Sequence, residues 1–157
     1  MVLSVLSVII DIVIFIGVLV VIIGVGTFFV IKDLQKEYKK VFRINSKFEI
    51  ELRKLVNLLY NFLESPKLEP YNNVVIKQLP HEENRNLIKI IDEIYTDMDK
   101  DKEENKYIIE TFQNLEELRR TRDSRVIIFN QKINLFPFNF YNKIMKLETY
   151  HTFVDKQ

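Results

Sequence analysis

Few residues in this chain have the types and spacing that metal or acid–base chemistry requires. Glu148 and His151 form one Glu-x-x-His pair, whereas a carboxylate-bridged di-metal bundle needs two such pairs and further acidic ligands. Residues 97–101 resemble the opening of an EF-hand, but Lys102 stands where that loop needs Gly and Ile108 where it needs a bidentate Glu. We therefore expect no catalytic residues, no metal site and no bound cofactor.

The other polar features are also weak signals for a reaction. His81 has no carboxylate at the helical offset before it, and the sequence contains no phosphate-binding, dinucleotide-binding or zinc-protease motif. The absence of Cys excludes disulfides and thiolate chemistry. A cluster of arginines could receive an anionic partner, yet nearby Glu116 and Glu117 favour a solvated helix face. The cluster comprises Arg119, Arg120, Arg122 and Arg125.

The most informative element is the apolar N-terminal run. Residues 12–31 contain no charge, and twenty helical residues are enough to cross a hydrocarbon layer about 30 Å thick. A cleaved signal peptide would need a basic start and a shorter apolar core. A buried soluble helix or an interfacial helix would need a polar face, which residues 18–23 lack. The sequence therefore predicts a transmembrane anchor over residues 1–31.

The charges on either side of the run predict its orientation. Residues 1–31 contain no Lys or Arg, whereas residues 32–54 contain eight basic against four acidic residues. Positive flanks stay cytoplasmic, so we expect the N-terminus outside and residues 32–157 in the cytosol. Asp11 then lies at the outer headgroup level, where a carboxylate costs little. If Asp11 lay deeper, it would need a partner and would become a candidate site.

Composition also limits the partners. The cytosolic part carries 23 basic and 21 acidic residues, a balance that argues against a nucleic-acid binder. The lipid bilayer is the first expected partner. Gly17 and Gly24 lie seven residues apart without a G-x-x-x-G motif, which is weak evidence for a homo-oligomer.

The rest of the chain shows helical periodicity and no convincing strand. One apolar stripe runs from Val41 to Phe62, and the absence of Gly and Pro predicts that the spanning helix continues unbroken to Ser65–Pro66. Residues 87–98 mark a second helix, and a third stripe extends from Ile108 to Phe136, interrupted only by Arg122. A last helix is expected over residues 139–154, with Tyr141, Ile144 and Met145 inward. We expect an all-α fold in which the transmembrane helix continues into an antiparallel cytosolic bundle.

Three features of these helices have a structural and a ligand-binding interpretation. Asn61 lies beside the first stripe and Asn130 beside the third, and a buried Asn can fix helix register through its side-chain hydrogen bonds. Phe136–Pro137 is expected to end the helix and to close the bundle end with the Phe ring. For these residues we favour the structural role.

Two segments resemble the LemA family. Residues 45–54 and 57–64 read NSKFEIELRK and NLLYNFLE, and they are similar to the family's long helix, WSxIDVxLxRRxDLIPNLVE. Phe129–Asn130, Ile133 and Phe136–Pro137, with Asn139 and Phe153, are similar to its terminal pattern YNxxIxxFPxN. Departures are Tyr60 for Pro, Leu55 for a basic residue and Lys146 for Gly, and residues 65–85 are shorter than the family's second helical region. The resemblance implies a divergent, shortened member: a membrane anchor followed by a LemA-like helical bundle over residues 32–157.

Taken together, these patterns predict a protein that acts by binding. The leading hypothesis is a non-enzymatic scaffold at the inner face of a bacterial cell membrane, with an unidentified membrane or cytosolic protein as partner. The alternative is an accessory or regulatory subunit of a membrane enzyme such as a protease, working through its spanning helix. A metal-dependent enzyme is the third hypothesis, and the ligand count disfavours it.

Overall fold

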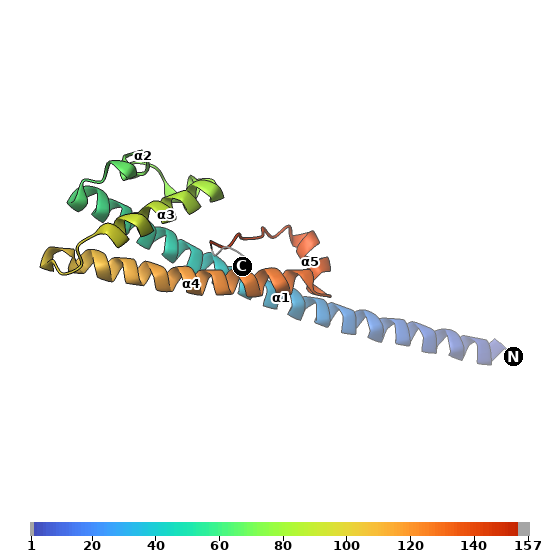
Figure 1. Cartoon of the computed structure of the whole chain (residues 1–157). Helices are drawn as coiled ribbons and strands as arrows, with labels where there is room; N and C mark the ends of the chain where they lie inside the picture. The colour runs from blue at the N-terminus through green and yellow to red at the C-terminus, as the bar shows by residue number, and fades with distance from the viewer. Residues whose placement is uncertain (1, 154–157) are drawn as a thin grey trace.

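The computed structural model describes the backbone of residues 2–153 and the side chains of residues 9–153. This part of the chain is all-α, with 84% helix and no strands. Figure 1 shows one long helix whose N-terminal half projects as a bare rod, while the other helices gather along its C-terminal half. The all-α prediction is confirmed.

Helix α1 (Val2–Leu63) carries the apolar run and the first stripe as one continuous rod of 62 residues. At 1.5 Å per residue such a helix is about 93 Å long. It ends where the sequence predicted, because Glu64 takes a left-handed conformation with φ of 46° and Pro66 follows. The structure therefore passes from the apolar run into the charged region without a hinge.

Helix α4 (Lys106–Asn134) packs antiparallel against the second half of α1. Its register is marked by two side-chain contacts. Lys132 Nζ lies 2.5 Å from Asp33 Oδ2 near the apolar run, and Arg122 Nε donates to Asn45 Oδ1 at 2.7 Å halfway along the pair. The C-terminal end of α4 therefore lies beside the middle of α1, and the N-terminal end of α4 lies toward the C-terminal end of α1.

The remaining elements cover the two ends of this helix pair. Helix α3 (His81–Asp97) lies over the distal half, and α5 (Phe138–Met145) lies beside α1 near the apolar run (Figure 1). The connections are short helical turns: η1 (Pro66–Leu68), α2 (Glu69–Asn72), η2 (Ile76–Gln78) and η3 (Glu103–Asn105). Leu87 and Ile91 of α3 are fully buried, as their helical spacing predicted.

Two hydrophobic clusters hold the pair together, with a polar layer between them. The distal cluster joins α1 from Phe48 onward to α3 and the first half of α4. The proximal cluster, nearer the apolar run, consists of Leu34, Val41, Val126, Phe129 and Ile133, with Tyr38, Phe138, Tyr141, Met145, Leu147 and Tyr150 packed against it. Arg122 and Asn45 lie in the chain between the members of the two clusters.

Several predicted core positions are wrong. Phe62 is 67% exposed and Ile144 is 63% exposed. Phe136 is 85% exposed, so its ring does not close the bundle end; Phe138 and Tyr141 of α5 pack there instead. The last helix ends at Met145 and does not reach residue 154, because Lys146 turns left-handed with φ of 51°. Residues 147–153 contain no further helix and form a tail.

Candidate functional site

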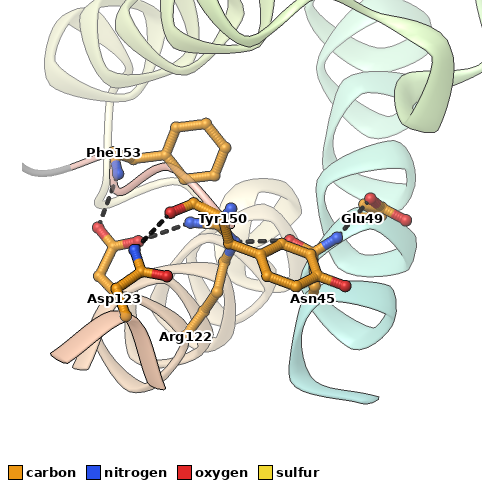
Figure 2. A network of polar contacts seen from close by, with 7 residues as sticks. Asn45, Glu49, Arg122, Asp123, Tyr150 and Phe153 are labelled. Atoms are coloured by element: carbon orange, nitrogen blue, oxygen red, sulfur yellow. Dashed lines mark hydrogen bonds and ion pairs between the residues drawn. The ribbon is translucent and has the colours of Figure 1, made fainter. Parts of the chain in front are cut away.

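The most unusual polar group of the bundle is the buried guanidinium of Arg122. Its helical spacing places it on the inner stripe of α4, where its side chain is 5% exposed. Nη1 donates to Asp123 Oδ1 at 2.7 Å and Nε donates to Asn45 Oδ1, as Figure 2 shows. Its guanidinium carbon lies 4.2 Å from the centroid of the Phe153 ring. The prediction that the arginine cluster is a solvated face is therefore wrong for Arg122.

The same layer fastens the C-terminal tail to the helix pair. Asp123 Oδ2 accepts a hydrogen bond from the Phe153 backbone N–H at 2.9 Å. Figure 2 shows this contact between Asp123 and Phe153. Asn130 Nδ2 donates to the Tyr150 carbonyl at 2.8 Å, so two side chains of α4 hold two backbone groups of the tail. The tail in turn covers Arg122. These contacts connect α1, α4 and the tail. We call this set of residues the clamp: Asn45, Arg122, Asp123, Asn130, Tyr150 and Phe153.

A small hollow opens beside this clamp. Its volume is about 170 Å³, and it is bounded by α1, η2, the start of α3 and the tail. Asn84 Oδ1 is buried and accepts no hydrogen bond among the described residues, while Asn84 Nδ2 donates to the Leu79 carbonyl at 3.2 Å. The lining includes Asn45, Glu49, His81, Asn84, Arg122, Thr149, Tyr150 and His151.

Burial changes the titration of three groups around the hollow. It lowers the pKa of Arg122, and the Asp123 carboxylate opposes that effect. Burial also raises the pKa of the Tyr150 hydroxyl, with a further contribution from Tyr38. The pKa of His81 is lowered by burial and then by His151, whose ring centroid lies 5.0 Å away. These shifts keep Tyr150 protonated and favour neutral His81 at neutral pH.

The clamp residues hold the tail against the helix pair, and the small polar hollow lies beside them. Arg122 forms an ion pair with Asp123, so its guanidinium presents no uncompensated charge to a ligand. Among residues 9–153 no group of three His, Asp or Glu side chains is placed to hold a metal ion. His151 is exposed and adjoins His81, and Glu148 is also exposed.

A second, more apolar groove also adjoins η2. Its volume is about 350 Å³, and its walls come from α1 and from residues 73–77. Arg53 shapes the wall by donating to the carbonyls of Tyr71, Asn72 and Val74, which fixes the loop against α1. Ile50 and Val75 stand at the groove with 68% and 55% exposure.

The other residues singled out from the sequence are placed as follows. Asn61 is exposed on the last turn of α1 and is not buried in the core. Asn130 is half-buried; its Nδ2 donates to the Tyr150 carbonyl, while its Oδ1 accepts no hydrogen bond among the described residues, and its structural role stays a prediction. Pro137 follows the end of α4, and the Phe136–Pro137 bond is cis. Asp11 is exposed on the projecting rod.

Sequence reasoning missed the importance of Arg122, although a signal was present. Arg122 is in phase with Leu115 and Phe129, each seven residues away, and both of these are buried. A charged residue at a stripe position must be paired or exposed, and Asp123 next to it was the available partner. Comparisons with protein-family models, curated proteins and solved structures find no match to this chain.

Proposed function

We propose that this protein is a single-pass membrane protein whose cytosolic bundle binds a protein partner without catalysing a reaction. The observation that carries the proposal is the bare half of α1. Every residue from 9 to 26 is exposed, and the described remainder of the chain covers none of this surface. Contiguous apolar surface of this size is not left in water by soluble monomers. A bilayer is the environment that fits it.

The energetics of insertion support the same conclusion. Sixteen of the twenty residues from 12 to 31 are Ile, Val, Leu or Phe. At about −0.3 to −0.6 kcal/mol each, they favour insertion by roughly 5–10 kcal/mol. The basic residues that follow favour a cytosolic bundle and an external N-terminus.

The apolar groove beside η2 is the surface best suited to a protein partner. Exposed Ile50 and Val75 supply apolar contacts, while Glu49 and Lys77 at the same groove supply charges of both signs for specificity. Lys77 also lies 5.9 Å from the ring of Phe42, which is 47% exposed. We further propose that the chain is a divergent, shortened LemA-family protein; the two motif resemblances support this.

Topology mapping tests the anchor, and the absence of native Cys makes single-Cys labelling unambiguous. Ser7→Cys reports on the N-terminal end, and Ser124→Cys reports on an exposed position of α4. With a membrane-impermeant maleimide, we expect S7C to react in intact cells and S124C to react only after permeabilisation. The protein should also stay in the membrane pellet after carbonate washing. Labelling of S124C in intact cells would refute the proposed orientation, and a soluble protein would refute the anchor.

Site-specific photo-crosslinking tests the binding role. A photoreactive residue at Val75 samples the groove, and the same residue at Ile127, 47% exposed on α4, is the matched control. We expect a discrete crosslinked species of higher mass from position 75 in living cells and a different or absent pattern from position 127. Identical patterns at both positions would argue against the groove as the binding surface.

A further inference from the structure

Helix α5 is apolar on two sides, but only one side is packed. Phe138, Tyr141 and Met145 face the proximal cluster. On the other side Phe140 is 57% exposed and Ile144 is 63% exposed. The turn before the helix adds Leu135 at 61% and Phe136 at 85% exposure. Four large apolar side chains within residues 135–144 are thus left uncovered by the described chain.

The position of α5 along α1 is fixed by a hydrogen bond. The hydroxyls of Tyr141 and Thr27 are 2.6 Å apart. Thr27 lies four residues before Ile31, the end of the charge-free run, which corresponds to about 6 Å of helix. The Lys132–Asp33 ion pair already lies near the end of this run, and α4 continues past it toward the projecting rod (Figure 1). Any bilayer that surrounds residues 12–31 therefore reaches the level of α5.

We infer that α5 and the preceding turn, residues 135–145, form a second membrane contact that inserts into the lipid surface beside the spanning helix. This inference rests on the proposed membrane anchor. Helices that lie in the interface are buried about 5–10 Å into the headgroup and acyl boundary, which matches the level set by Thr27. Lys143 and Lys146 are exposed and supply cations for anionic headgroups. The bundle thus lies against the membrane surface at this end.

Lipid is the occupant that the geometry favours over a protein. Tyr141 holds α5 beside Thr27 of the apolar run, so the exposed side chains of α5 lie at the level of the last part of that run. A soluble partner would have to displace lipid at this level. A second copy of the chain or another membrane protein remains an outcome of the test.

The absence of native Trp allows single-Trp variants to report lipid contact at chosen positions. Phe136→Trp samples the turn and Phe140→Trp samples α5. Phe62→Trp is the matched control, because Phe62 is 67% exposed at the distal end of α1. Phe15→Trp samples the spanning segment itself. The full-length protein is reconstituted into phosphatidylcholine–phosphatidylglycerol vesicles with lipids brominated near the headgroup end of the acyl chains.

We expect bromolipids to reduce F136W and F140W emission by roughly twofold or more, as for an interfacial depth, and to leave F62W emission unchanged. If F15W is quenched but F136W and F140W remain as unquenched as F62W, the inference about α5 is overturned and the anchor is still supported. A blue-shifted but unquenched F136W would also overturn it, since protein would then cover the segment. Unquenched F15W would instead refute the proposed anchor.

Discussion

Replacing Arg122 by Met should destabilise the bundle by about 3–5 kcal/mol, because it leaves a buried carboxylate without its cation. The side chains of Arg122 and Asp123 are 5% and 4% exposed, so water cannot compensate for the lost partner. Total stabilities of domains are about 5–15 kcal/mol, so this loss is a large fraction. Arg120→Met is the matched control on the same helix, because Arg120 is exposed, and it should change stability by less than about 0.5 kcal/mol.

Removing both charges should cost much less than the two single changes together. Asp123→Asn alone leaves the Arg122 cation buried and should also cost about 3–5 kcal/mol. In R122M/D123N the Asn oxygen can still accept from the Phe153 N–H, and the main loss is the donor to Asn45, about 1–3 kcal/mol. If the effects were independent, the double variant would lose roughly 6–10 kcal/mol. A strongly non-additive cycle is the expected result.

Urea unfolding of the full-length protein in detergent micelles, followed by far-ultraviolet circular dichroism, measures these differences. The micelle keeps the apolar run helical, so the transition reports on the bundle. Equal midpoints for R122M and R120M would contradict the buried ion pair. Additive losses in the cycle would show that Arg122 and Asp123 act independently, which would refute the clamp.

Three further changes test other parts of the structure. Lys146→Gly should stabilise the protein by up to about 1 kcal/mol, since Gly adopts the left-handed conformation without strain, whereas Lys143→Gly inside α5 should destabilise it by a similar amount in thermal unfolding. Tyr141→Phe removes the bond to Thr27, worth about 1 kcal/mol, and should speed amide exchange in α5 about fivefold in nanodiscs. The folded-state pKa of His81 is lowered, so its contribution to stability is present above its unfolded pKa of about 6.5 and is lost as the pH falls below that value. His81→Gln should reduce this loss. Denaturant titrations at pH 7.5 and 5.5, about one unit either side of that pKa, measure it.

Helical periodicity predicted which helices form, but it did not predict every residue that packs against a neighbouring helix. The stripes of α1 and α4 were correct through most of their length, because burial on one side of a helix imposes its own spacing. They failed at their last members, Phe62 and Phe136. A stripe continues in the sequence as long as apolar residues recur, whereas packing stops where the partner helix stops. The length of a helix pair is a tertiary property and leaves no local signal.

The end of the last helix shows the same limit in a different form. Residues 147–153 do not continue α5, because Lys146 turns left-handed and the clamp holds backbone groups of the tail. Asp123 and Asn130 hold the Phe153 N–H and the Tyr150 carbonyl, and the Phe153 ring covers Arg122. These contacts link residues about 20–30 positions apart, so no reading of the tail alone predicts them.

If α5 lies at the membrane surface as we infer, the clamp should determine its depth, and this connection is testable. The buried residues Arg122, Val126, Phe129 and Ile133 recur every three or four residues, so a purely apolar stripe could shift by one turn along α1 and still pack. A slip of one helical turn moves α5 by about 5.4 Å, which is comparable to the depth of an interfacial helix. Arg122 favours the observed register, because in that register its Nε donates to Asn45 of α1.

We therefore expect the bromolipid quenching of the Phe136→Trp reporter to change when R122M/D123N is also present. The bundle of this double variant should keep most of its stability. The loss of the polar layer should spread the reporter over more than one depth in bromolipid quenching. R120M with the same reporter is the control and should match the unmodified background. A single unchanged depth in R122M/D123N would show that the apolar clusters alone fix the register, and that the buried ion pair serves only to hold the tail.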